Sequence, residues 1–212
     1  MPINLTKGQA VDFSKDAHDL DQITIGLGWT VKEKRIGAVA TVSTQGDEAE
    51  FDLDAIAFLL DKDNKVRNRG DAKLVGGDVV FFNSRVHPSG TVTHSGDNRT
   101  GGTGERDDEQ IVVRLNSVPM EYNRILFLVS IYQGIKHGQH FGQIGSAYIR
   151  AVDGRGQEIV RYSLSSAAAY EGQCTMLFGE VSRHGQCWRF RAIGDAYPYD
   201  SFVHLLKEYL PN

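Results

Sequence analysis

The chain has 212 residues, of which 41% are hydrophobic and 24% are charged, as is typical of a folded protein. Its 23 basic and 27 acidic residues give a net charge of −4, which argues against binding nucleic acid through bulk positive charge. No stretch approaches the ~20 apolar residues of a membrane-spanning helix, and the first residues lack the pattern of a secretory signal. Two cysteines do not make a disulfide scaffold, so we expect a cytoplasmic protein with reduced thiols.

Short segments with apolar residues at alternate positions recur along the chain, which is typical of β-strands. In chain order, strands are predicted at 23–29, 50–61, 79–82, 111–115, 125–132, 147–152, 158–164, 174–182 and 188–193. The segment 125–132 is almost continuously apolar, which indicates a central strand covered on both faces. The chain has 23 glycines but only five prolines, which indicates turns between strands rather than low complexity.

Only the C-terminal end has a helical pattern. The apolar residues of 202–209 recur at the spacing of one helix face, Asp200 or Ser201 can cap the start, and Pro211 ends the segment. Many short strands and one helix predict an all-β fold, an antiparallel β-sandwich of two packed sheets with a short C-terminal helix. Because no repeat or linker divides the chain, we expect a single domain over residues 1–212.

The two cysteines, Cys174 and Cys187, lie in neighbouring predicted strands. A hairpin turn at His184-Gly185 would place them too far apart for a disulfide. Neither cysteine has an obvious flanking cation that would lower the pKa of its thiol. We therefore expect both thiols to be inert.

An acidic pair, Asp52 and Asp54, stands at the start of the predicted strand 50–61. Residues two apart on a strand point the same way, so the two carboxylates lie side by side. Ile56 and the apolar residues that alternate after it follow on the same face and are expected to be buried. The pair is therefore expected at the rim of the sheet, although an Asp-x-Asp pair alone is weak evidence for a metal.

An acidic loop, residues 95–109, contains four glycines and five acidic side chains and ends against the apolar strand 111–115. Like charges ~4 Å apart repel by ~1 kcal/mol in water. A hard divalent cation such as calcium removes this repulsion and accepts carboxylate, amide and backbone oxygens as ligands. From composition and spacing, a divalent-cation site and a solvated surface loop both remain open.

Several blocks of sequence, taken in order, closely resemble the tellurite-resistance TerD family. They span roughly residues 3 to 195 and are Gly26-Leu27-Gly28-Trp29, Phe51-Asp52-Leu53-Asp54-Ala55, Ser95-Gly96-Asp97-Asn98-Arg99-Thr100-Gly101, Asp107-Asp108-Glu109-Gln110-Ile111, Val129-Ser130-Ile131-Tyr132, Phe141-Gly142-Gln143, Ala147-Tyr148-Ile149-Arg150, Phe178-Gly179-Glu180 and Trp188-Arg189-Phe190-Arg191-Ala192-Ile193-Gly194.

The resemblance implies a calcium-binding β-sandwich without enzymatic activity, in a bacterial stress-response system linked to tellurite, oxidants and phage. Its implied partners are calcium ions and other stress-response proteins. The family's calcium site, for two ions, consists of the acidic pair and the acidic loop. The residues carried over are Asp52, Asp54, Asp97, Asn98, Asp107, Asp108 and Glu109, with Thr100 and Gly104 as further oxygen donors. One calcium ion would leave four of the six negative charges uncompensated, which favours two ions.

The sequence departs from the family pattern at three places. The loop segment 101–106 is one residue longer, Ile56 stands where serine is common, and Gln133 stands where an acid is common. An extra residue is expected to change the direction of the Asp107 side chain, and Gln133 offers a neutral oxygen in place of a charged one. The affinity of one of the two calcium sites is therefore in doubt.

Alternative functions remain open at this stage. The basic segment 32–35 precedes an apolar stretch, 36–42, which favours either a calcium-dependent adaptor at an anionic membrane surface or an added hairpin packed on the body. A metal-dependent hydrolase or transferase would use the same carboxylates, but the sequence has no nucleophile elbow and no phosphate loop. Direct reduction of tellurite would need reactive thiols.

Overall fold

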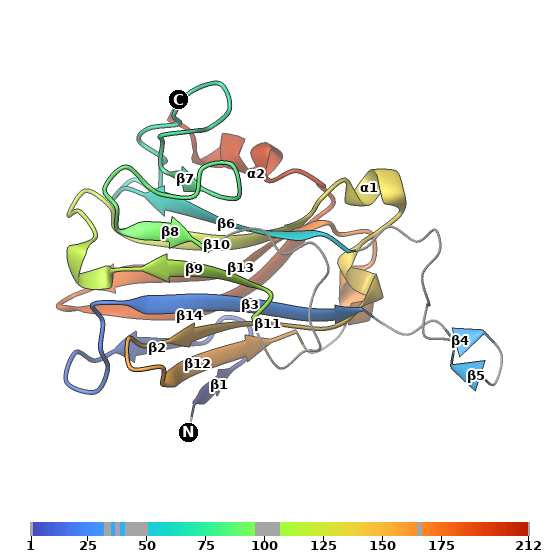
Figure 1. The fold of residues 1–212 in the computed structure, drawn as a ribbon, viewed down its shortest axis with the longest axis horizontal. Coiled ribbons are helices and arrows are strands. Elements are labelled where there is room, and N and C mark those ends of the chain that lie inside the picture. The colour runs from blue at the N-terminus through green and yellow to red at the C-terminus, as the bar shows by residue number, and fades with distance from the viewer. Residues whose placement is uncertain are drawn as a thin grey trace.

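The computed structural model describes residues 2–31, 35–36, 39–40, 51–95, 107–164 and 167–211. Two six-stranded sheets form its body (Figure 1). Sheet A has the strand order β1-β12-β11-β3-β9-β8, and sheet B has the order β2-β14-β13-β10-β6-β7. The strands of sheet A are β1 (Ile3–Leu5), β3 (Ile23–Val31), β8 (Val92–His94), β9 (Glu109–Val113), β11 (Ile144–Val152) and β12 (Glu158–Ser163). The strands of sheet B are β2 (Ala10–Phe13), β6 (Leu53–Leu60), β7 (Val79–Val80), β10 (Arg124–Ile131), β13 (Thr175–His184) and β14 (Cys187–Tyr197).

The smaller elements lie outside these two sheets. The short strands β4 (Arg35–Ile36) and β5 (Val39–Ala40) pair in a third sheet. One helical turn, α1 (Gly134–His137), follows β10, and the helix α2 (Phe202–Tyr209) ends the chain. Three 3-10 turns are found at Leu115–Ser117, Phe141–Gln143 and Ala167–Tyr170. Within the described ranges, neither α-helix is long and apolar enough to cross a bilayer.

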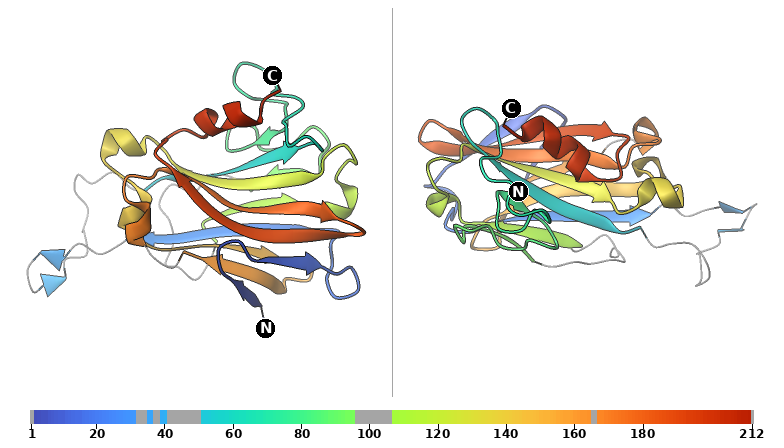
Figure 2. Two further views of the ribbon diagram at one scale, coloured as in Figure 1. Left: turned by 180° about the vertical axis from the view of Figure 1, so that it is seen from behind. Right: turned by 90° about the horizontal axis from the view of Figure 1, so that it is seen from above.

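The predicted antiparallel sandwich with a C-terminal helix is confirmed. Figure 2 shows the two sheets as stacked layers, and every named strand pair is antiparallel except β1 with β12. Each predicted strand has a counterpart in the structure, and α2 begins after Ser201, whose hydroxyl accepts a hydrogen bond from the N–H of Val203. The short strands β1, β2 and β8 were not predicted, because three or four residues do not establish an alternating pattern.

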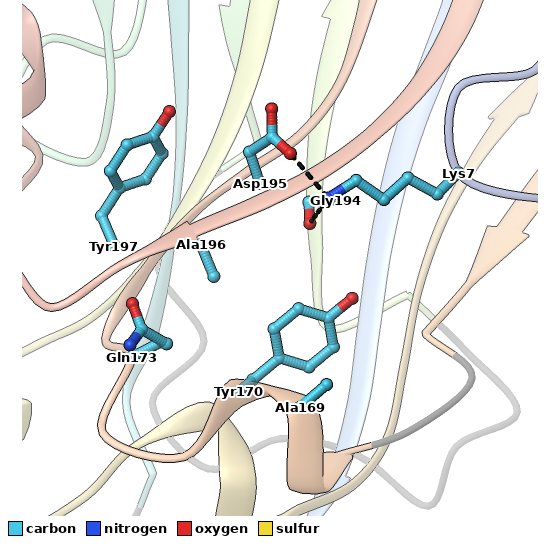
Figure 3. A pocket seen from close by; sticks show the side chains of 8 residues that line it. All are labelled: Lys7, Ala169, Tyr170, Gln173, Gly194, Asp195, Ala196 and Tyr197. Atoms are coloured by element: carbon cyan, nitrogen blue, oxygen red, sulfur yellow. Dashed lines mark hydrogen bonds and ion pairs between the residues drawn. The ribbon is translucent and has the colours of Figure 1, made fainter.

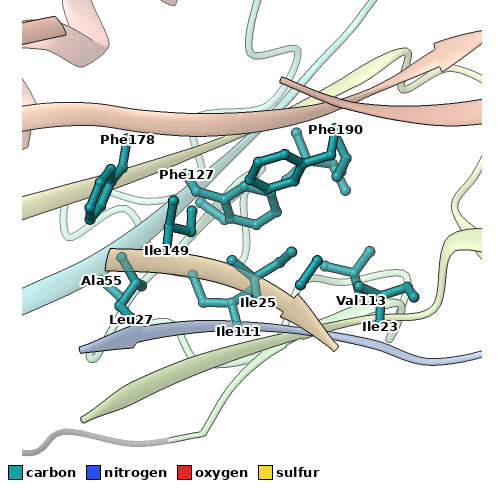
Figure 4. Close-up of a cluster of buried hydrophobic side chains, with 14 of the residues drawn as sticks. Ile23, Ile25, Leu27, Ala55, Ile111, Val113, Phe127, Ile149, Phe178 and Phe190 are labelled. Atoms are coloured by element: carbon teal, nitrogen blue, oxygen red, sulfur yellow. The ribbon is translucent and has the colours of Figure 1, made fainter. Parts of the chain in front are cut away.

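The main core lies between the two sheets. Side chains from sheet A, such as Ile25 and Ile149, face Phe127 and Phe190 from sheet B (Figure 4). Each of these four side chains is fully buried. Because side chains alternate along β6, every second one points into this core, namely Leu53, Ala55, Ala57 and Leu59. This contact holds the sheets together as one sandwich.

A second, smaller core covers the outer face of sheet B. Ile56, Phe58 and Leu60 of β6 point away from sheet A and are fully buried. The ring of Phe58 lies 6.2 Å from Phe202 and 5.8 Å from Tyr209, both on α2. The C-terminal helix therefore covers one part of sheet B, and β6 and β10 are buried on both faces, as predicted for 125–132.

The hairpin between β13 and β14 differs from its prediction in register. His184 pairs with Cys187, so the turn consists of Gly185 and Gln186 and not of His184 and Gly185. Gly185 has φ of +59°, which glycine adopts without strain in a two-residue hairpin turn. Both cysteines are free thiols, as expected.

The carboxylate of Asp78 is 1% exposed and ties the long connection after β6 to the body. It accepts hydrogen bonds from the N–H groups of Arg67 and Asn68 (2.9 and 2.8 Å), from the Tyr122 hydroxyl (2.8 Å) and from the His87 ring (3.2 Å). Burial acts to raise the pKa of Asp78, but the hydrogen bonds from His87, Asn68 and Tyr122 outweigh burial and hold the pKa below its usual value. The ionised form therefore stabilises the fold.

Asp78→Asn is expected to lower the free energy of unfolding by roughly 2–4 kcal/mol at pH 7, because four donors lose a charged acceptor. A lowered folded-state pKa stabilises the protein above pH ~4, and this contribution is lost as the pH falls through the folded pKa. The difference between wild type and variant is therefore largest at neutral pH and shrinks under acid. Urea unfolding at several pH values measures it.

Asp63→Asn is the matched control, because the Asp63 side chain is exposed and pairs with exposed Lys62 at 2.7 Å, so its loss should leave unfolding nearly unchanged. Equal stability of Asp78→Asn and wild type at pH 7 would contradict the role given to Asp78.

Candidate metal centre

The acidic pair and the end of the acidic loop meet where β6 and β9 begin. Glu109, the first residue of β9 in sheet A, accepts a hydrogen bond from the backbone N–H of Ala55 in sheet B. Ala55 directly follows Asp54, so this contact joins the two acidic segments across the gap between the sheets. Asp54, Asp108 and Glu109 are 8%, 8% and 1% exposed.

The open edge of β6 explains why Glu109 can reach Ala55. The neighbouring strand β7 pairs with Ala57 and Phe58, and the part of the chain that the structure describes places no strand beside the first residues of β6 on that side. Glu109 alternates with Ile111, which belongs to the inter-sheet core, so its side chain points between the sheets. The carboxylate thus takes the place of a strand partner at this edge.

A buried histidine lies behind this carboxylate. The Nε2 atom of His94, at the end of β8, is 3.5 Å from Oε2 of Glu109, and the two side chains are 0% and 1% exposed. His94 reaches this place because β8 pairs with β9 and sets His94 opposite Ile111. Sequence analysis did not select His94, since a single histidine at the end of a three-residue strand carries no recognisable spacing.

Asp108 is held by the backbone of β3. Its Oδ2 atom accepts a hydrogen bond from the N–H of Trp29 at 2.9 Å, and its own N–H donates to the carbonyl of Leu27 at 2.7 Å. The β3–β9 ladder ends with Leu27 opposite Glu109, so Asp108 lies just outside the last pair of this ladder. The sheet therefore fixes both the position and the direction of the carboxylate.

Asp107 has a different environment, because its carboxylate faces an arginine. Arg150 on β11 donates to it from Nε (2.7 Å) and Nη2 (3.0 Å), and the Tyr148 hydroxyl and the Gln110 amide donate at 3.1 Å each. The hydrogen bond to Asp107 is the largest effect that raises the pKa of Arg150. Burial and then the nearby carboxylate of Asp107 raise the pKa of Tyr148 to about 12, so its hydroxyl remains a donor at neutral pH.

Two glycines of β3 make room for this contact. A Cβ atom at Gly26 would lie 2.1 Å from Oδ2 of Asp107, and one at Gly28 would lie 2.5 Å from the Tyr148 ring. The motif Gly26-Leu27-Gly28 is therefore needed for the approach of Asp107 and Tyr148 to the sheet. This is a packing role that the sequence alone did not indicate.

The carboxylates surround the start of β6 and do not line a single face. Alternation places Asp54 on the outer face of sheet B together with Ile56, whereas Glu109 approaches from between the sheets. Asp54 pairs with Ser130 of β10, whose hydroxyl lies 2.8 Å from that of Thr175. Asp52 precedes β6, and its carbonyl accepts a hydrogen bond from the N–H of Tyr132 at 2.8 Å. The remaining predicted ligands, Asp97, Asn98, Thr100 and Gly104, lie outside the described residues.

A shallow hollow of roughly 580 Å³ lies elsewhere, beside β14. Its lining includes Lys7, Tyr170 and Tyr197 and none of the predicted ligands (Figure 3). The Lys7 ammonium is 2.6 Å from Asp195 and donates to the carbonyl of Gly194 at 3.1 Å. Because the charge of Lys7 is already paired, the hollow offers little attraction to an anion.

Comparisons with known proteins agree with this architecture. The family model described as TerD domain matches residues 1–209. The chain is 45% identical to tellurium resistance protein TerX of Serratia marcescens, over 99% of this chain and 100% of that protein. It is 41% identical to tellurium resistance protein TerD of the same organism, over 93% of this chain and 92% of that protein.

A solved structure has the same fold. It is the crystal structure of a homologue of telluride resistance protein (TerD) from Streptomyces coelicolor A3(2), with a TM-score of 0.62 and 19% identity, covering 90% of this chain and 99% of that chain. Together with the match over nearly the whole sequence, the relatives at 41–45% identity show that the chain belongs to the TerD family.

Proposed function

We propose that this chain is a non-enzymatic calcium-binding module of a tellurite and chemical-stress resistance system. The observation that carries the proposal is the hydrogen bond from Ala55 to Glu109, which brings both acidic segments to one end of the sandwich. Calcium accepts six to eight oxygen ligands in flexible geometry, and the carboxylates gathered there are donors of this kind. When bound, calcium would neutralise the carboxylates and cross-link the two sheets.

The proposed ligands among the described residues are Asp52, Asp54, Asp108 and Glu109. Asp54 and Asp108 are held by strands, and backbone N–H groups of β3 and β6 orient Asp108 and Glu109. His94 supports Glu109 from behind, as outer groups commonly support metal-ligating carboxylates. The acidic loop supplies Asp97, Asn98, Thr100 and Gly104 in this proposal. One calcium ion would leave three of the five ligand charges uncompensated (5 − 2 = 3), which favours two ions.

We assign Asp107 a positioning role within this site. All four acceptor positions of its carboxylate are filled, two by the guanidinium of Arg150, one by the Tyr148 hydroxyl and one by the Gln110 amide, which leaves none for a metal ion. The pair fixes the point at which the acidic loop joins β9, directly before Asp108. Asp107 thereby helps to orient the carboxylates of Asp108 and Glu109.

Calcium in excess is expected to raise the melting temperature relative to protein kept in chelator. At 100 times the dissociation constant, each independent site adds ~2.7 kcal/mol to the stability. Asp54→Asn should reduce this shift, because it removes a ligand charge, whereas exposed Asp63→Asn should keep it. Differential scanning calorimetry provides the measurement. An unchanged melting curve for wild type in calcium and chelator would count against the proposal.

The roles of Asp107 and Asp108 can be separated by comparing their amide variants. Asp107→Asn should destabilise the calcium-free protein by about 1.5–3 kcal/mol, because Arg150 loses its charged partner, and should keep most of the calcium-induced shift. Asp108→Asn should diminish the calcium-induced shift itself. Melting curves of each variant, with and without calcium, test this. Loss of the calcium response in Asp107→Asn with an unaltered calcium-free melting temperature would make Asp107 a direct ligand.

The resistance role is proposed from the relatives named for tellurium resistance. Tyr132 and Ile135 are exposed and lie next to the acidic end. The N–H of Tyr132 donates to the carbonyl of Asp52, and Ile135 follows three residues later in α1. Two exposed apolar side chains beside a calcium site favour contact with other stress-response proteins. The proposal places the protein in the cytoplasm, and its two free thiols support a reducing compartment.

In a bacterium whose own copy of this gene is deleted, wild-type protein should restore growth on tellurite. Asp54→Asn should restore growth less well, because its calcium binding is weakened, and Asp63→Asn should restore growth fully. Colony counts over a tellurite series, with protein levels checked by immunoblot, are the measurement. Full rescue by an Asp54→Asn protein that binds no calcium would separate calcium from resistance.

A further inference from the structure

Three potential metal ligands of different chemistry meet at the β13–β14 hairpin. Asp12 of β2, His184 of β13 and Cys187 of β14 each offer one ligand atom, and these atoms lie within 4.8 Å of one another. Asp12 and His184 are exposed and Cys187 is partly exposed. We propose that these three side chains form a site for zinc or a similar borderline divalent ion, separate from the calcium site.

The strand pairing explains why the three side chains share one face. His184 stands directly opposite Cys187, next to the two-residue turn, and Asp12 stands opposite Arg189, two residues beyond Cys187. The intervening Trp188 points into the inter-sheet core, so Cys187 and Arg189 point outward. Because all three ligands are on paired strands, their spacing is held by the backbone ladder.

The ligand atoms come close enough for a zinc ion after side-chain rotations. The Nδ1 atom of His184 is 3.5 Å from Oδ1 of Asp12, and the thiol sulfur of Cys187 lies within 4.8 Å of a ligand atom of each. Zinc bonds of ~2.0–2.3 Å in tetrahedral geometry put ligand atoms about 3.3–3.8 Å apart. Three protein ligands leave the fourth position for water.

The donor set selects the class of metal. A thiolate and an imidazole favour zinc and related ions over calcium or magnesium, which prefer oxygen ligands. Binding would displace the thiol proton of Cys187 to solvent, so the affinity should rise with pH. The sequence analysis expected an inert thiol because no flanking cation was evident, whereas the structure brings His184 and Arg189 around it.

Arg189 supports the carboxylate ligand and does not exclude a metal. It donates to Asp12 from Nε at 2.6 Å and from Nη2 at 3.1 Å. A carboxylate has about four acceptor positions, and metal-bound carboxylates are commonly hydrogen-bonded in this way. The hydrogen bond from Arg189 is the main cause that lowers the pKa of Asp12, which keeps the carboxylate ionised.

The two proposed sites lie at opposite ends of sheet B. Ser130 of β10 pairs with Asp54 on one side and with Thr175, the first residue of β13, on the other. His184 is the last residue of β13. Nine residue steps along a strand correspond to about 30 Å. Each site can therefore be tested while the other is kept constant.

The test is zinc binding by the full-length protein in excess calcium and a non-thiol reductant, in competition with a chromophoric zinc chelator. Wild type should bind one zinc at this hairpin, and Cys187→Ser, His184→Gln and Asp12→Asn should each weaken binding by about tenfold or more. Cys174→Ser is the matched control, because Cys174 is buried and distant from the hairpin. Cobalt in place of zinc should give a thiolate-to-cobalt absorption band in wild type and Cys174→Ser but not in Cys187→Ser.

Unchanged zinc affinity in Cys187→Ser, or absence of the thiolate-to-cobalt band in wild type, would overturn the proposal. Far-ultraviolet circular dichroism and the calcium-induced melting shift identify any variant that has lost its fold. Because a positive result depends on Cys187, which lies at the opposite end of sheet B, zinc bound at the acidic end cannot account for it.

Discussion

The hydrogen bond between the Ala55 amide and the Glu109 carboxylate is the contact on which the candidate site depends. It crosses from one sheet to the other beyond the end of β7, on the side of β6 that faces away from β10. A carboxylate in this place satisfies an edge N–H group and, by the same bond, brings the acidic loop to the acidic pair. The contact adds to the apolar core between the sheets and fixes the acidic loop against the acidic pair at this end. The site is thus a product of how the sandwich closes at one end.

Buried carboxylates in this protein are stabilised in different ways, and the difference separates their roles. Asp78 is surrounded by four hydrogen-bond donors and holds a long connection in place. Asp107 is paired with Arg150 and anchors the end of the acidic loop. Asp108 and Glu109 accept hydrogen bonds from backbone N–H groups, which orient their carboxylates. The last kind of environment is the one that suits a cation ligand.

The two ends of sheet B carry different kinds of potential metal ligand. Carboxylates gather where β6 begins, and hard ions such as calcium prefer such oxygen ligands. A thiol, an imidazole and a carboxylate meet at the β13–β14 hairpin, and this set suits zinc. The sandwich core between them is apolar and closely packed, so each end has its own electrostatic environment. The two proposed sites therefore differ in the class of metal ion that their ligands favour.

Apolar patterns by themselves determined most strands of both sheets, though not β1, β2 and β8, and also the central position of 125–132 and the C-terminal helix. Burial of one or both faces leaves such a local pattern. The sequence also showed which residues carry the acidic chemistry, from Asp52 to Glu109. Only the tertiary structure decided that Arg150 pairs with Asp107 and that Glu109 accepts a hydrogen bond from the Ala55 N–H. It also placed His94 beside Glu109. The same holds for the meeting of Asp12, His184 and Cys187. These contacts join residues far apart in the chain, and they depend on strand order and register, which no local periodicity encodes.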